Sequence, residues 1–186
     1  QRTWDEFYQT YWRLIYSVAL KSGLRSEEAF DCVQETILSI AKQSKKKLYD
    51  PEQGSFKTWL MNMTRWRIND QFRKRKKDTA MGAGFGDEDR KTAVIDRVED
   101  PRGDVLDRLW ETEWKKNVAD AALARVKAQV SPKQYQIFDY YVVKQWSAKK
   151  VQDHLSVSMA QVYLAKHRVG SVLKKELVKL EKEAED

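Results

Sequence analysis

Residues 56–77 read FKTWLMNMTRWRINDQFRKRKK, a stretch without proline or glycine that predicts one long helix. Aromatic and basic side chains share this helix, namely Trp59, Trp66, Phe72, Arg65, Arg67, Arg73, Lys74, Arg75, Lys76 and Lys77. Cations attract phosphates, and flat rings stack on unpaired bases. The pattern therefore predicts a surface that holds opened nucleic acid strands.

The rest of the chain predicts an all-α protein. Its 186 residues include only three prolines and seven glycines, and the apolar residues recur mostly at helical spacing. Two helices are expected before a loop at residues 48–55, which holds a proline and a glycine, and Ser55 is expected to cap the basic helix. From residue 78 to 104 the periodicity fails, and glycines and acids accumulate. We expect two small helical domains, 1–77 and 105–186, joined by a flexible acidic linker at 78–104.

The charge pattern divides the chain in the same way. The formal net charge is +7, but residues 65–77 and 144–175 each carry seven basic residues and one acid, whereas residues 78–113 carry eleven acids and five basic residues. This pattern suggests two surfaces for a polyanion, joined by a segment that avoids it. Alternatively, each basic block is an ordinary solvated helix face.

The C-terminal part has the spacing of a helix-turn-helix. Ser147 is expected to cap a short helix, and a turn at 156–158 leads into a helix with Val162, Ala165 and Val169 inward. Two helices joined by so short a turn are typical of DNA-binding proteins, although an antiparallel pair inside a bundle has similar spacing.

The second expected helix carries a mostly polar patch. Its members lie three and four residues apart and therefore share one face; they are Asp31, Gln34, Glu35 and Leu38. From spacing alone, the patch is either exposed surface or a docking site.

Composition argues against several classes of protein. The single cysteine, Cys32, allows no intrachain disulfide, and no apolar run is long enough for a membrane span or a signal peptide. The only histidines are His154 and His167, and no paired metal-ligand motif or phosphate loop occurs. We expect a soluble cytoplasmic protein with no enzymatic activity, cofactor or membrane insertion.

The order of these pieces is more specific than any one of them. The motifs at 31–36, 49–51, 54–60 and 69–75 resemble the second conserved region of bacterial sigma factors of the extracytoplasmic-function type. The motifs at 155–158 and 162–169 resemble the fourth region of the same family, and the helix around residues 110–114 is similar to that of a subgroup.

The resemblance implies a role for each surface. The patch on the second helix would dock on the clamp helices of the largest RNA polymerase subunit, and the flap would be a further contact. The minus-ten promoter element would be recognised and held open by Tyr49, Asp50, Ser55, Phe56, Trp59, Asn62, Arg65, Trp66, Asn69, Arg73 and Arg75. The minus-thirty-five element would be bound as duplex by Lys149, Lys150, Ser158, Gln161, Tyr163, Leu164, Lys166, His167 and Arg168. Family members are often held inactive by an anti-sigma protein, although no residue here identifies one.

Some residues leave alternatives open or depart from the family. Trp59 is either mainly a core residue or a base contact. Trp66 stands where the family often has asparagine, so the family supplies no base preference for this chain. Ser156 replaces a frequent glycine and requires either a different backbone or a strained serine. A regulator that uses its helix-turn-helix alone would explain the C-terminal part but not the motif at 31–35.

Overall fold

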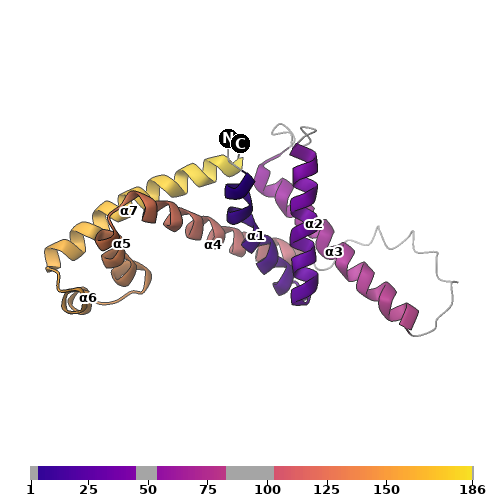
Figure 1. Cartoon of the computed structure of the whole chain (residues 1–186), viewed down its shortest axis with the longest axis horizontal. Helices are drawn as coiled ribbons and strands as arrows, with labels where there is room; N and C mark the ends of the chain where they lie inside the picture. The colour runs from indigo at the N-terminus through magenta and orange to yellow at the C-terminus, as the bar shows by residue number, and fades with distance from the viewer. Residues whose placement is uncertain (1–3, 45–53, 83–102, 186) are drawn as a thin grey trace. The chain divides into compact units, whose positions relative to one another are not determined.

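The computed structural model describes residues 4–44, 54–82 and 103–185, and every element within these ranges is helical (Figure 1). The helices are α1 (Trp4–Lys21), α2 (Ser26–Ser44), α3 (Phe56–Gly82), α4 (Gly103–Gln129), α5 (Pro132–Phe138), α6 (Ala148–Leu155) and α7 (Met159–Glu185). A π-helical segment, Asp139–Val143, continues α5. The predicted all-α class is confirmed. None of the helices in these ranges is both long and apolar enough to cross a membrane.

The chain forms two compact units, and their boundary lies inside α4. The first unit runs to Asn117, and the second begins at Val118. Helix α3 continues past Lys77 to Gly82, into the segment predicted as linker, while residues 83–102 of that segment lie outside the described ranges. The predicted functional regions 1–77, 78–104 and 105–186 are a different division of the chain and remain a proposal.

The first unit is built around α1, α2 and α3, which pack pairwise (Figure 1). Each helix contributes an apolar stripe at helical spacing, because residues three and four apart share a face. The buried side chains include Leu14, Ile15, Val18, Ala29, Cys32, Val33, Leu60 and Ile68. Cys32 is fully buried, and burial raises the pKa of its thiol to about 12. Cys32 is therefore a packing residue of this core.

The first half of α4 completes this core. Trp110 and Trp114 are almost fully buried, and the Trp114 ring stacks on Tyr11 with their centroids 5.9 Å apart. Their neighbour Glu113 is 5% exposed and accepts hydrogen bonds from Ser17 Oγ at 2.6 Å and Lys21 Nζ at 2.5 Å. Burial alone would raise the pKa of Glu113, but these bonds outweigh it and lower the pKa.

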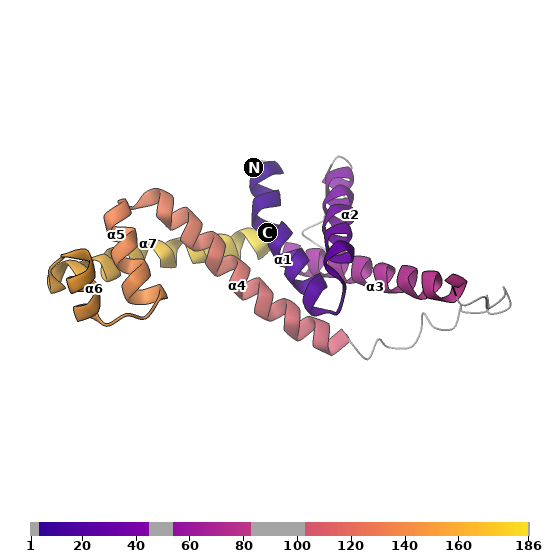
Figure 2. The same cartoon turned by 60° about the horizontal axis from the view of Figure 1, so that its bottom comes forward.

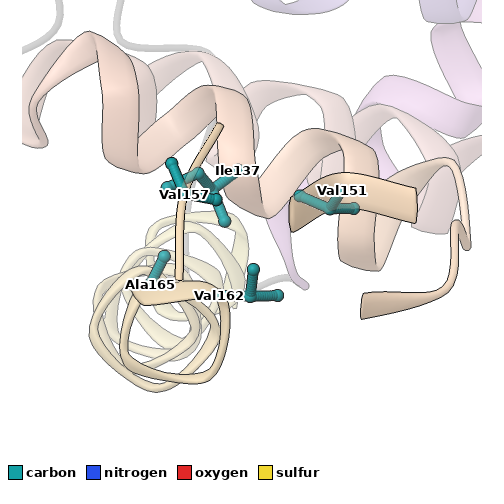
Figure 3. Close-up of a cluster of buried hydrophobic side chains, with 5 residues drawn as sticks. All are labelled: Ile137, Val151, Val157, Val162 and Ala165. Atoms are coloured by element: carbon teal, nitrogen blue, oxygen red, sulfur yellow. The ribbon is translucent and has the colours of Figure 1, made fainter. Parts of the chain in front are cut away.

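The second unit contains the C-terminal part of α4 together with α5, α6 and α7, and Figure 2 shows α5 and α6 beside one end of the long helix α7. Its core brings together Ile137, Val151, Val157, Val162 and Ala165 (Figure 3). A second cluster, Val126, Phe138 and Val169, joins the C-terminal part of α4 to α5 and α7. The residues predicted to point inward on α7, Val162, Ala165 and Val169, are therefore buried.

Local caps begin and end the helices of the second unit. Ser131 and Ser147 accept hydrogen bonds from the backbone N–H groups of Gln134 at 3.3 Å and Lys150 at 3.2 Å. At the end of α6, Ser156 is left-handed, with φ 51° and ψ 50°. The serine is thus held in a conformation that favours glycine, which is one of the two alternatives left open by the sequence.

Candidate nucleic-acid interface

Aromatic packing fixes the beginning of α3. Ser55 Oγ accepts a hydrogen bond from the backbone N–H of Thr58 at 3.2 Å, which confirms the predicted cap. The half-buried Phe56 ring lies 5.3 Å from Tyr11 and 5.7 Å from Trp59, measured between centroids. Trp59 is half-buried as well. Both Phe56 and Trp59 therefore contribute to packing in the first unit, whatever else they contact.

Trp66 differs from the other aromatic residues of α3. Its side chain is 54% exposed, the largest exposure among the exposed aromatic residues of the first unit's described part. The guanidinium carbon of Arg67 lies 4.4 Å from the centroid of the Trp66 ring, which is within the range of a cation–π contact. An exposed, flat ring on a basic helix is suited to stacking on an unpaired base.

Arg67 itself points back toward α2. Its Nη2 atom donates a hydrogen bond to Ser39 Oγ at 2.6 Å, and its Nη1 atom donates one to Glu35 Oε2 at 3.3 Å. The Arg67 side chain is only 18% exposed. This arginine is therefore an internal link between α3 and α2.

Two other arginines of α3 are also engaged inside the first unit. Arg65 forms an ion pair with Asp107 of α4. Arg75 forms an ion pair with Glu28 of α2, and the hydrogen bond from Arg75 Nε to Glu28 Oε1 measures 2.8 Å. The hydrogen bond from Arg75 is the main reason that the pKa of Glu28 is lowered from 4.5 to about 2. Both arginines therefore already serve contacts within the first unit.

The remaining residues predicted for the minus-ten element lie in different places. Asn62 and Arg73 are exposed, and Asn69 is partly exposed. Tyr49 and Asp50 lie outside the described residues. Among the predicted minus-ten residues on α3, the exposed ones are therefore Asn62, Trp66 and Arg73.

The polar patch of α2 lies mostly open to solvent. Asp31 and Gln34 are exposed, and Leu38 is 57% exposed. Glu35 is partly buried, because it accepts hydrogen bonds from Arg67 and, at 3.0 Å, from Lys74 Nζ. The pairing with Glu35 raises the pKa of Lys74. The patch offers one apolar contact among acceptors, and its member Glu35 also belongs to the α2–α3 contact.

In the second unit, two of the predicted DNA-contacting residues form a helix cap. Ser158 Oγ accepts from the backbone N–H of Gln161 at 3.1 Å, and the Ser158 backbone N–H donates to Gln161 Oε1 at 2.8 Å. This reciprocal arrangement is a capping box at the beginning of α7. Ser158 and Gln161 therefore have a structural use independent of DNA.

The other candidate residues of the second unit lie on exposed faces of α6 and α7. Tyr163 is 51% exposed and Leu164 46% exposed, while His167 and Arg168 follow on the same helix. Lys166 Nζ lies 5.6 Å from the centroid of the Tyr141 ring, and Lys150 Nζ lies 3.9 Å from the centroid of the Trp146 ring. Lys149 forms an exposed ion pair with Asp153 at 3.7 Å. Except for the two cap residues, this set forms a mixed basic and aromatic surface.

Sequence reasoning assigned no role to Ser39 and counted Arg67 only among the basic residues of the nucleic-acid surface, not as a link to α2. The spacing of Ser39 could have indicated its role, because Ser39 follows Glu35 by one helical turn and therefore shares its face of α2. Asp107 was seen only as part of an acidic segment. Its pairing with Arg65 could not be predicted, because the two residues are far apart in the chain.

Comparison with known families identifies part of the chain. Residues 7–78 match the family model of sigma-70 region 2, a range that contains most of α1, all of α2 and most of α3. The match lies wholly within the first unit and does not reach the second. Comparisons with curated proteins and with solved structures each gave no match.

Proposed function

We propose that this chain is an alternative sigma factor of the extracytoplasmic-function type. It would bind core RNA polymerase, recognise the minus-thirty-five and minus-ten elements, and promote strand opening without catalysing a reaction or needing a cofactor. The observation that carries this proposal is the region 2 match across helices that combine an exposed patch on α2 with an exposed tryptophan on basic α3. Its place of action would be the cytoplasm, where polymerase and promoter DNA are found.

The α2 patch is the proposed contact with the clamp helices of the polymerase. Asp31, Gln34 and Leu38 are exposed on one face of the matched region. An apolar side chain surrounded by polar ones can bury its surface against a partner while the polar groups define the register. The polymerase flap and an anti-sigma protein are further proposed partners.

The α3 surface around Trp66 is the proposed contact with the opened minus-ten strand. Unstacking a base costs a few kcal/mol, and stacking on an aromatic side chain contributes about 1–3 kcal/mol per base. Trp66 therefore can offset much of the cost for one base. In the second unit, the exposed residues of α6 and α7 are the proposed contacts with duplex DNA at the minus-thirty-five element.

Reconstituted transcription tests the proposal directly. The purified chain is mixed with core polymerase and a promoter mapped from transcripts that its overexpression induces. We expect specific initiation that depends on both promoter elements. Binding to duplex DNA without binding to core polymerase would instead identify a regulator that uses only its helix-turn-helix.

The docking face needs a test that leaves Glu35 unchanged, because Glu35 also holds Arg67 and Lys74. We expect the double substitution Gln34→Lys and Leu38→Asp to weaken polymerase binding about tenfold or more, since loss of interface anchors typically exceeds 1 kcal/mol. Gln9→Lys is the control, because Gln9 is exposed on α1 and lies outside the patch. Equal affinity of the double variant and the control would remove α2 as the docking face.

A further inference from the structure

We infer that Arg67 is a positioning residue that holds the Trp66 ring as a preformed platform for base stacking, and that α2 fixes Arg67 through Glu35 and Ser39. The inference rests on the proposed function only in naming nucleic acid as the ligand of Trp66. The arrangement of the four side chains is a property of the free protein.

The guanidinium of Arg67 donates hydrogen bonds to two acceptors. Its Nη2 atom reaches Ser39 Oγ at 2.6 Å, and its Nη1 atom reaches Glu35 Oε2 at 3.3 Å. Both acceptors lie on α2, one helical turn apart. Because a guanidinium is planar and its donors form a rigid fork, two acceptors are enough to set the orientation of its plane.

The oriented cation in turn covers part of Trp66. The guanidinium carbon lies 4.4 Å from the centroid of the Trp66 ring, yet the tryptophan remains 54% exposed. The contact therefore restrains the ring without burying it. A ring that is already ordered loses less side-chain entropy when a base stacks on it, so preorganisation favours binding.

Two other uses of Arg67 fit the structure less well. A phosphate contact would require an accessible cation, and the Arg67 side chain is only 18% exposed and already donates to two acceptors. A purely structural link between α2 and α3 would not place the guanidinium over an exposed ring. The combination of burial, two acceptors and a cation–π contact favours the positioning role.

The first experiment reads the Trp66 ring in the full chain without polymerase or DNA. The seven tryptophans are labelled with a fluorinated analogue, and the Trp66 fluorine resonance is assigned by its loss in Trp66→Phe. The test variants are Arg67→Lys, which keeps the charge but loses the fork, and Ser39→Ala, which removes one acceptor. Lys74→Met is the matched control, because Lys74 also binds Glu35, at 3.0 Å.

We expect the Trp66 resonance to shift and broaden in Arg67→Lys and Ser39→Ala, while the other six resonances stay in place. In Lys74→Met the Trp66 resonance should keep its position. An unchanged Trp66 resonance in Arg67→Lys, with unfolding transitions like those of the wild type, overturns the inference. Because no polymerase or promoter is used, this outcome does not depend on the proposed function.

The second experiment measures promoter opening by holoenzyme, with a fluorescent base analogue in the minus-ten element. We expect Arg67→Lys and Trp66→Ala each to slow opening by roughly tenfold, and the double variant to be no slower than Trp66→Ala alone, because residues that act as a unit are not additive. If the double variant opened the promoter more slowly than Trp66→Ala, by the product of the two single losses in rate, the positioning role would be overturned. If wild-type holoenzyme opens no promoter, the proposed function fails, while the fluorine result still decides the arrangement of Arg67 and Trp66.

Discussion

The carboxylate of Glu28 is an acid-sensitive link between α2 and α3. Hydrogen bonding from Arg75 lowers the pKa of Glu28 from its ordinary value of 4.5 to about 2. A depressed carboxyl pKa contributes stability at pH values above the unfolded pKa, and the contribution is lost as the pH falls through the folded pKa. The ion pair should therefore stabilise the first unit fully at neutral pH and cease to do so at about pH 2.

We expect Glu28→Gln to lower the free energy of unfolding at pH 6 but to have little effect near pH 2. The measurement is urea unfolding of both proteins across this range, so that other titrating groups cancel in the difference. A constant difference between wild type and variant at every pH would show that the ionised pair is not responsible.

Ser156 carries a backbone cost that glycine would avoid. The residue ends α6 with φ 51°, and a left-handed conformation costs a non-glycine residue roughly 1–2 kcal/mol. Glycine loses more chain entropy on folding, so part of the gain is offset. We expect Ser156→Gly to raise the free energy of unfolding of the second unit by about 0.5–1 kcal/mol, measured by denaturant unfolding. Ser156→Ala, which retains the strain, should leave it nearly unchanged; stabilisation by alanine would contradict the explanation.

Helix α4 shows how one element can serve two cores. Trp110 and Trp114 belong to the first unit, whereas Val126 belongs to the second. We expect Trp110→Ala to destabilise the first unit by about 3–5 kcal/mol, because a large buried ring leaves a cavity. Hydrogen exchange of the full chain should then show lost protection in α1 and α3, while α6 and the beginning of α7 remain protected.

The control for this prediction is Trp66→Ala, which removes the same ring from an exposed position. Exposed substitutions usually change stability by no more than about 0.5 kcal/mol. If both tryptophan variants destabilised the first unit equally, α4 would not be part of its core.

These elements also show which parts of the structure could be predicted. The beginnings of α3 and α6 follow from Ser55 and Ser147, because a helix cap depends on residues within one turn. A helix around residues 110–114 was expected as well, but its sequence does not identify the surface that buries Trp110 and Trp114. The pairs of Arg65 with Asp107 and Arg67 with Glu35 join residues distant in sequence, and only folding reveals them. The expected region 2 agrees with the family model that matches residues 7–78, whereas the expected region 4, the extracytoplasmic-function type and the roles of individual residues stay predictions.

The charge of the whole chain should appear in the salt dependence of DNA binding. When the logarithm of affinity is plotted against the logarithm of salt concentration, each neutralised phosphate of duplex DNA contributes about −0.9 to the slope. We expect Lys166→Gln with Arg168→Gln to reduce the slope of holoenzyme binding to a minus-thirty-five duplex by roughly 1–2, measured by fluorescence anisotropy.

The matched control removes the same charge further along α7. Lys174 and Lys175 are exposed and basic but lie outside the predicted contact set. Lys174→Gln with Lys175→Gln should leave the slope nearly unchanged. Equal slopes for the two double variants would mean that the net charge of +7 acts as a whole rather than through the predicted face.

The double engagement of Glu35 has an evolutionary consequence. This carboxylate lies in the proposed docking patch and also holds Arg67 and Lys74. A substitution at position 35 would therefore alter two surfaces at once, and selection would act on both together. Among related chains we expect positions 35, 39, 66 and 67 to vary as a group: lineages that lack the tryptophan should also be free to lose the arginine and the serine.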